Sequence, residues 1–165
     1  MTKILIIYFS ETGNTEKMAY SVAEGVREEG VEHQIKKVQE ASVDDLLDVD
    51  GIVIGSPTYF GTMAAEIKLL LDKSVVHFNN LKGKVGGAFA SSALLGGGNE
   101  TTVLALLQAL LIHGMIIEGT TEGPHYGPVA LGSPDQGNLE ECKQLGRRVA
   151  RLVKKLRSAS AGQMV

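Results

Sequence analysis

The sequence predicts an α/β fold in which a five-stranded parallel sheet lies between two layers of helices. Two observations carry this prediction. Three apolar runs, at residues 3–9, 50–55 and 84–91, lack the alternation of polar and apolar residues, which is typical of strands buried on both faces. The segments between these runs repeat apolar residues at helical spacing. Strands that alternate with helices form parallel sheets through right-handed crossovers.

The first elements follow from spacing and terminators. The run at 3–9 (KILIIYF) is rich in β-branched residues and predicts the first buried strand. A helix is expected at 15–29, because its apolar residues recur every three or four positions and Gly30 follows as a terminator. The segment 31–38 alternates polar and apolar residues, which indicates a half-exposed edge strand.

The middle of the chain continues the same alternation. Ser42 is placed to cap a short helix over 44–47. The run at 50–55 (DGIVIG) predicts the second buried strand, and a helix is expected at 64–75, where apolar residues share one face. The third buried strand, at 84–91 (KVGGAFAS), carries glycines where a helix can approach closely.

The last elements are a helix, a strand and a long helix. The first of these begins at Asn99 or Thr101 and runs to His113. The segment 115–119 predicts the last core strand. Asn138 is expected to cap the final helix, which presents an apolar stripe.

Length and charge bound the function. The 165 residues suit one domain, at 1–157, followed by a frayed tail at 158–165. Sixteen Lys and Arg against nineteen Asp and Glu give a net charge of −3, which argues against a basic nucleic-acid arm or a polybasic membrane anchor. The longest stretch without charge, 101–117, is shorter than the ~20 residues that span a bilayer.

Cysteine and histidine usage adds two expectations. The single cysteine, Cys142, cannot form an internal disulfide, which favours a reducing compartment and hence a cytoplasmic protein. The four histidines show no spacing typical of metal ligands, so no metal site is expected. We expect neither nucleic acid nor a membrane as a partner.

A phosphate site is predicted where the first buried strand ends. The loop Ser10-Glu11-Thr12-Gly13-Asn14-Thr15 stands directly before a helix and offers hydroxyl and amide donors beside backbone N–H groups. It contains no cation, which fits a monophosphate held by hydrogen bonds. Neither the Walker motif nor the Rossmann glycine fingerprint occurs in the chain. An ordinary helix-capping turn is the alternative interpretation.

The loops after the other two buried strands predict a flat pocket. One reads Ser56-Pro57-Thr58-Tyr59-Phe60-Gly61-Thr62, with ring faces and a glycine that frees a peptide to face a ligand. The other reads Ser91-Ser92-Ala93-Leu94-Leu95-Gly96-Gly97-Gly98-Asn99. Three consecutive glycines cost conformational entropy, so we expect their backbone to touch a ligand. In open parallel sheets, ligands bind beyond the carboxyl ends of the strands.

Together these three motifs resemble the flavodoxin-like FMN proteins, and within them the WrbA-like NAD(P)H:quinone oxidoreductases. The resemblance extends over nearly the whole chain, including residues 69–72, 113–115 and 126–127. It implies a sheet of strand order 2-1-3-4-5 and FMN as cofactor. The chain is a shortened member, because the family's inserted segment between its second and third strands is missing and the segment 119–132 is short.

The resemblance also implies site residues and a reaction. The FMN phosphate would be held by Ser10, Thr12, Gly13, Asn14 and Thr15. The isoalloxazine would be lined by Pro57, Thr58, Tyr59, Phe60, Gly61, Ser91, Ser92, Gly96, Gly97 and Gly98. NAD(P)H would reduce the flavin by hydride transfer, and a quinone would take two electrons from it, with His125 or Tyr126 as candidate proton donor.

One rival function stays open. A flavodoxin-type electron carrier, which passes electrons between protein partners, fits the same loops. Carriers tend to be strongly acidic and to stack an aromatic side chain on the flavin, whereas this chain has a charge of only −3 and Ala93-Leu94-Leu95 at that place. The helix around 103–112 is apolar on almost all sides, which favours a homo-oligomer, a dimer or tetramer.

Overall fold

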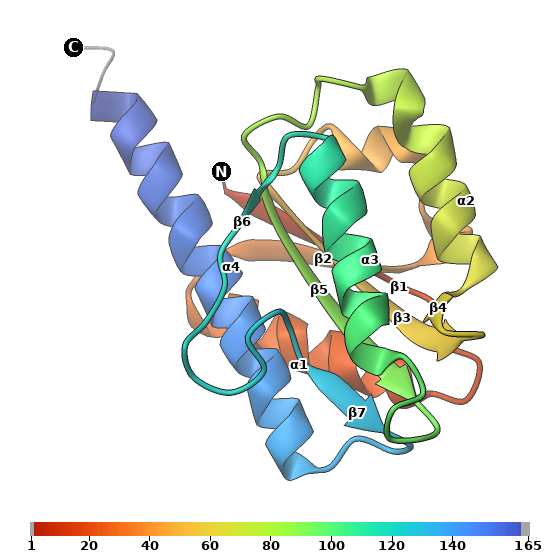
Figure 1. Cartoon of the computed structure of the whole chain (residues 1–165). Coiled ribbons are helices and arrows are strands. Elements are labelled where there is room, and N and C mark those ends of the chain that lie inside the picture. The colour runs from red at the N-terminus through yellow and green to blue at the C-terminus, as the bar shows by residue number, and fades with distance from the viewer. Residues whose placement is uncertain (1, 163–165) are drawn as a thin grey trace.

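A seven-stranded sheet with helices on both faces forms the protein (Figure 1). The computed structural model describes residues 2–162. The main path of the sheet has the order β2-β1-β3-β5-β6, and these strands pair in parallel. The strands are β1 (Lys3–Tyr8), β2 (Glu32–Lys37), β3 (Gly51–Tyr59), β4 (Thr62–Met63), β5 (Val85–Ser92), β6 (Ile116–Ile117) and β7 (Val129–Leu131).

The predicted fold class and strand order are confirmed, but the sheet has two strands more than the five expected. β4 returns antiparallel to the end of β3. The expected last strand at 115–119 is shortened to β6, which pairs with the start of β5, and a strand that was not expected, β7, pairs with the end of β5. The segment between them leaves the ladder because it is rich in glycine and proline, which pair poorly within a strand.

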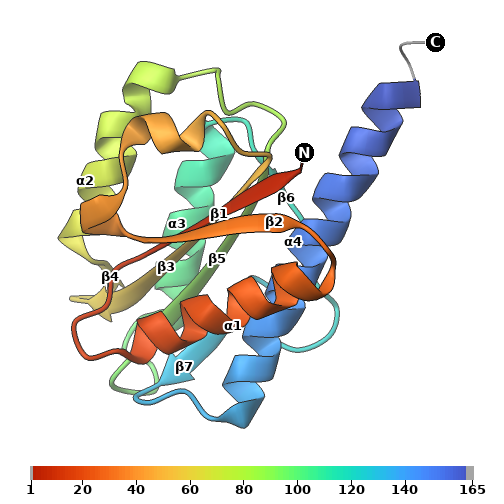
Figure 2. The ribbon, with the colours of Figure 1, turned by 180° about the vertical axis from the view of Figure 1, so that it is seen from behind.

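Within residues 2–162, four α-helices cover the sheet, and Figures 1 and 2 show helices on both of its faces. The helices are α1 (Asn14–Glu28), α2 (Ala65–Lys73), α3 (Asn99–Ile112) and α4 (Gln136–Gly162). α1 and α4 lie on one face, and α2 and α3 on the other. Alternate residues of β1 enter the two cores: Ile4 and Ile6 on the α1–α4 side, Leu5 and Ile7 on the other. All four are fully buried, which explains why the run is continuously apolar.

Three short 3₁₀ helices connect these elements, η1 (Val38–Glu40), η2 (Val43–Leu46) and η3 (Ser74–His77). The cap predicted at Ser42 is confirmed. The Ser42 hydroxyl accepts a hydrogen bond from the Asp45 N–H (3.3 Å), and the Asp45 carboxylate accepts one from the Ser42 N–H (2.7 Å). This reciprocal pair is a capping box, formed here on η2.

The prediction for the start of the last helix was wrong by three residues. The Asp135 carboxylate accepts a hydrogen bond from the Asn138 N–H (2.8 Å), and the Asn138 side-chain oxygen accepts one from the Asp135 N–H (3.2 Å). Asp135 is therefore the cap and Asn138 its partner. At the other end α4 continues to Gly162, past residue 158, where the sequence suggests fraying. Residues 163–165 lie outside the described residues. None of the described helices combines the length and the apolarity needed to cross a membrane.

Candidate functional site

Three loops meet at one edge of the sheet, beyond the carboxyl ends of β1, β3 and β5, which are neighbours and run parallel (Figure 1). Two sets of contacts join them. The Thr15 hydroxyl, in the first turn of α1, lies 2.9 Å from the Ser91 hydroxyl of β5. A Cβ placed on Gly98 would lie 2.9 Å from Gly61 Cα, so the second and third loops touch through their backbones. The structure thus brings together the loops that the sequence singled out.

The first loop ends in a helix start that lacks a side-chain cap. Gly13 is the N-cap residue in the left-handed conformation (φ 86°), and its own N–H donates to the Ser10 hydroxyl (3.1 Å). The N–H groups of Asn14, Thr15 and Glu16 have no acceptor among the described residues. Such a helix start binds anions through free N–H groups and the helix dipole. Thr12 is exposed beside it, and the Thr15 hydroxyl is buried.

The second loop is a tight hairpin. β3 runs to Tyr59, four residues beyond the expected strand, and β4 returns from Thr62. The two residues between them, Phe60 (φ 49°) and Gly61 (φ 84°), are both left-handed, as in the type I′ turn that closes two-residue hairpins. The Phe60 ring is fully exposed. The Tyr59 ring packs edge-on against Phe9, with centroids 6.1 Å apart.

A buried serine holds this hairpin in place. Ser56 is fully buried; its hydroxyl donates to the Pro57 carbonyl (2.8 Å) and accepts from the Ala64 N–H (2.9 Å). Burial raises the pKa of the nearby Tyr59 phenol, and the charges of Glu11 and Glu66 add to the rise. Tyr59 is therefore neutral even in alkaline solution.

The third loop folds back on itself after β5. The Leu94 carbonyl accepts from the Ser92 hydroxyl and from the Gly97 N–H, both at 3.1 Å. Gly96 (φ 71°) and Gly98 (φ 100°) are left-handed, and Gly98 is the N-cap residue of α3 without a side-chain cap. Because Gly97 already donates within the loop, the free backbone donors of the glycine run are those of Gly96 and Gly98.

Sequence reasoning missed the threonine that ties the second loop to the third. The Thr58 hydroxyl donates to that of Thr102 (3.0 Å), which donates to the Gly98 carbonyl (2.8 Å). Thr102 is fully buried in the first turn of α3. Its position one turn after a glycine-rich loop, where hydroxyls reach back to the backbone, was the available signal.

The proposed proton donors stand on a fourth segment, outside the three loops. His125 and Tyr126 belong to the segment between β6 and β7, which Figure 1 shows beside α4. His125 Nδ1 donates to the Thr120 carbonyl (2.9 Å), within the same segment. Across residues 2–162, no hydrogen bond or ring contact joins either side chain to the three loops. Their role in proton transfer stays a prediction.

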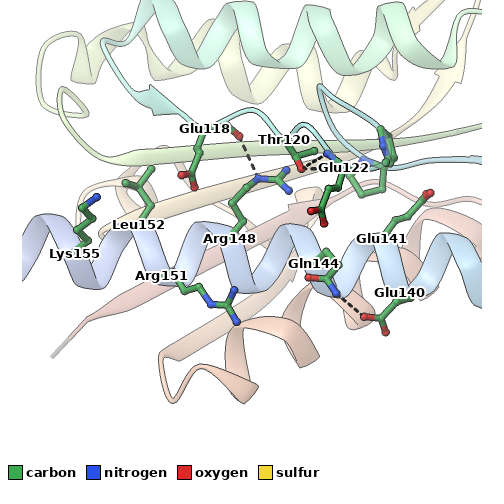
Figure 3. A pocket seen from close by; sticks show the side chains of 13 residues that line it. Glu118, Thr120, Glu122, Glu140, Glu141, Gln144, Arg148, Arg151, Leu152 and Lys155 are labelled. Carbon is green, nitrogen blue, oxygen red and sulfur yellow. Dashed lines mark hydrogen bonds between the residues drawn. The ribbon is translucent and has the colours of Figure 1, made fainter.

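The same segment and α4 enclose a cavity of about 490 Å³ (Figure 3). Glutamates line it, including Glu118, Glu122 and Glu141, beside the cations Arg148 and Lys155. Arg148 Nε donates to the Glu118 carbonyl (3.2 Å), and burial lowers the pKa of its guanidinium. Charges of both signs thus lie close together here, and none of the predicted site residues lines the cavity.

Comparison with known proteins identifies the family. A family model of the flavodoxin domain matches residues 5–100. The chain belongs to the flavodoxin family. A protein of Archaeoglobus fulgidus named NAD(P)H dehydrogenase (quinone) is 36% identical to it over 94% of this chain and the whole of that protein. A flavodoxin of Aquifex aeolicus is 40% identical over 93% of this chain and 88% of that protein.

Solved structures agree. The flavodoxin, WrbA-like protein from Agrobacterium tumefaciens superposes with a TM-score of 0.80 and 27% identity, covering 94% of this chain and 99% of that one. A flavodoxin from the domain Archaea gives a TM-score of 0.77 and 26% identity, covering 93% and 99%. FMN is the cofactor of this flavodoxin domain.

The residues present fit FMN. Its phosphate needs several donors and no competing capping side chain, and the uncapped start of α1 meets both needs. Its ring system needs backbone that approaches closely, which the left-handed Gly61, Gly96 and Gly98 provide. Which of the predicted residues touch FMN stays a prediction, because the contact of each residue with FMN is inferred from the position of its loop.

Proposed function

We propose that the protein is an FMN-dependent oxidoreductase that reduces quinones with NAD(P)H. The observation that carries the proposal is the apolar rim of the site, formed by the exposed side chains of Phe60, Leu94 and Leu95. These side chains stand on the second and third loops of the site. Exposed apolar groups at a site favour the docking of planar apolar ligands, such as a quinone ring.

Relatives with this activity in their names support the choice of substrates. Besides the Archaeoglobus protein, that of Sinorhizobium fredii bears the name NAD(P)H dehydrogenase (quinone), at 34% identity over 94% of this chain and 99% of that protein. We therefore propose NAD(P)H and a quinone as the two substrates of this chain.

The roles of the chain's own residues follow from the geometry. FMN, when bound, supplies the two-electron redox chemistry. The donors of the first loop would hold its phosphate, and the hairpin at Phe60–Gly61 would present peptide groups to its ring system. The free N–H groups of Gly96 and Gly98 would stabilise negative charge on the ring system. The apolar rim excludes water from the substrate and orients it.

We also propose that the protein is a cytoplasmic homo-oligomer. Leu111 and Ile112, at the end of α3, are 54% and 72% exposed, and Val75 and Val76 of η3 are 66% and 69% exposed. A second subunit would cover these apolar side chains.

The proposed compartment agrees with the state of the single cysteine. Burial raises the pKa of the Cys142 thiol, which disfavours the reactive thiolate, so the thiol needs no oxidising compartment.

An electron carrier is the second candidate, favoured by one observation. The alignment with the Archaeoglobus protein spans 190 positions, more than the 165 residues of this chain, so that relative contains inserted segments. The alignment with the Aquifex flavodoxin spans only 162. In loop length this chain is therefore closer to the flavodoxin.

An anaerobic titration separates the two functions. The FMN-loaded protein is mixed with NADH or NADPH while the flavin absorbance is followed. We expect rapid bleaching by one of the nucleotides and full recovery on addition of one equivalent of benzoquinone. A flavin that stays oxidised with both nucleotides, yet accumulates a stable one-electron-reduced form during titration with dithionite, would instead identify an electron carrier.

A further inference from the structure

A carboxylate stands in the first turn of the helix that is built to bind an anion. Glu16 is the third residue of α1, and its own N–H is one of the three free groups at the helix start. A glutamate at this position commonly folds back over the helix start and caps it. There it would occupy the place of the FMN phosphate and repel it.

Two residues outside the helix hold this carboxylate elsewhere. The Tyr8 hydroxyl donates a hydrogen bond of 2.5 Å to Glu16 Oε1, and Lys37 Nζ lies 3.5 Å from the same oxygen. Tyr8 and Lys37 are opposite each other in the register of β1 and β2. The sheet therefore fixes both partners, and the hydrogen bond from Tyr8 lowers the pKa of the Glu16 carboxyl, which is an anion at neutral pH.

Packing alone does not explain why the side chain at position 8 carries a hydroxyl group. Tyr8 is 2% exposed, and the other β1 residues on its face, Ile4 and Ile6, are aliphatic. Burial and the neighbouring Glu16 raise the pKa of the phenol, so it remains a donor. A phenylalanine would fill the same space without binding Glu16.

We propose that Tyr8 and Lys37 are positioning residues that hold the Glu16 carboxylate out of the phosphate cradle, so that the chain binds the phosphorylated flavin in preference to riboflavin. The inference rests on FMN as the cofactor of the proposed function, but not on the identity of either substrate. A purely structural brace between β1 and α1 would support both flavins equally.

The test measures the affinity of the apoprotein for FMN and for riboflavin by quenching of flavin fluorescence. In Tyr8→Phe we expect FMN to bind about tenfold more weakly, because the released charge approaches the phosphate, and riboflavin affinity to change less than about twofold. Adding Glu16→Gln to Tyr8→Phe should restore FMN affinity. Tyr20→Phe, which removes an exposed hydroxyl from the same helix, is the matched control.

Two further variants test the roles of Glu16 and Lys37 separately. Glu16→Gln alone should bind FMN at least as tightly as the wild type, and Lys37→Met should weaken FMN binding less than Tyr8→Phe does. An equal loss for both flavins in Tyr8→Phe, or a loss that Glu16→Gln leaves in place, would overturn the proposal. So would a wild type that binds FMN no more tightly than riboflavin. A protein that passes these tests but ignores NAD(P)H contradicts only the proposed reaction.

Discussion

The Thr15 side chain links the loop after β1 to the end of β5. Thr15 is 1% exposed and is the second residue of α1, and its hydroxyl lies 2.9 Å from that of Ser91 at the end of β5. A buried hydroxyl without a partner costs about 1–3 kcal/mol. Separating the Thr15 and Ser91 hydroxyls is therefore unfavourable, and their hydrogen bond fixes the distance between the first and third loops. Thr12, two residues before the helix, is exposed and free to reach a ligand.

The two threonines lead to a prediction for cofactor retention. In the double variant Thr12→Val and Thr15→Val, the first loop loses two hydroxyl donors, and we expect the purified protein to lose its FMN. The FMN-to-protein ratio after gel filtration measures this loss. Thr121→Val, at an exposed position outside the three loops, should retain FMN fully. Wild-type FMN content in the double variant would refute the phosphate-binding role of this loop.

Phe60 combines backbone strain with full exposure. A bulky residue in the left-handed region costs about 1 kcal/mol or more, and the exposed ring returns no burial energy. We expect Phe60→Gly to unfold at an equal or slightly higher denaturant concentration than the wild type, yet to lose roughly tenfold in kcat/KM for a quinone, which is about 1.4 kcal/mol of transition-state stabilisation. Unchanged quinone kinetics would remove Phe60 from the substrate site.

His113 predicts how stability depends on pH. Its Nε2 lies 2.7 Å from the Ser74 hydroxyl, which itself donates to the Leu71 carbonyl, so the ring donates through Nε2 and its buried Nδ1 has no partner in the described part of the chain. Burial, with a smaller effect of His77, lowers the pKa of His113. The unfolded chain then binds the proton more readily below about pH 6.5, so acidification destabilises the fold.

Chemical denaturation at a series of pH values tests this prediction. The free energy of unfolding of the wild type should fall as the pH drops from 7 towards 5. In His113→Gln, whose amide can still donate to Ser74, the fall should be smaller. Parallel profiles for the two proteins would mean that another group controls the pH dependence.

At the scale of elements, α1 and α4 pack through two glycines. A Cβ on Gly25 would lie 2.1 Å from the Lys143 carbonyl oxygen, and one on Gly146 would lie 2.1 Å from that of Val22. Ion pairs flank the crossing, among them Glu24 with Lys143 (2.9 Å). Exposed pairs of this kind contribute little each, so the close backbone contact decides how the helices fit.

The crossing gives a prediction with a control on the same helix. Gly146→Ala should lower the free energy of unfolding by about 1–3 kcal/mol, because backbone atoms must move apart to admit the methyl group. At Gly137→Ala a Cβ would lie 3.2 Å from Asp135 Oδ1, a side-chain atom that can shift more easily than backbone, so we expect the free energy of unfolding to change by less than about 1 kcal/mol. Urea denaturation measures both. Equal effects would contradict the crossing seen here.

At the scale of the whole molecule, the sequence predicts what neighbouring residues determine. The runs at 3–9, 50–55 and 84–91 and the polar loops after them are local signals, and their meeting at one edge follows from parallel order. The presence of β7 was not predictable in this way. It depends on pairing with β5, which is distant in the sequence, and on contacts such as the hydrogen bond from the Ala90 N–H to the Pro128 carbonyl (3.0 Å).

Contacts across the site were hidden for the same reason. Thr58 and Thr102 are 44 positions apart, and nothing near either residue in the sequence reveals their hydrogen bond. The prediction of Asn138 as the cap failed differently, since Asp135, another good capping residue, stands three positions earlier and only the backbone decides between the two. Local chemistry thus located the site, whereas tertiary contacts set its exact support.

The apolar surface beside α3 is the feature that one subunit leaves unexplained. α3 is apolar on nearly every side, and the sheet covers only part of it, so Leu111 and Ile112 remain exposed near Val75 and Val76 of η3. We expect the wild type to sediment as a homo-oligomer and Ile112→Glu to shift it towards the monomer, because a charge placed in an apolar interface is desolvated without a partner. Tyr20→Glu places the same charge at an exposed position of α1, away from this surface, and should leave the assembly intact. Retained FMN in both variants would show that they fold. A monomeric wild type would mean that this surface meets a different protein or none.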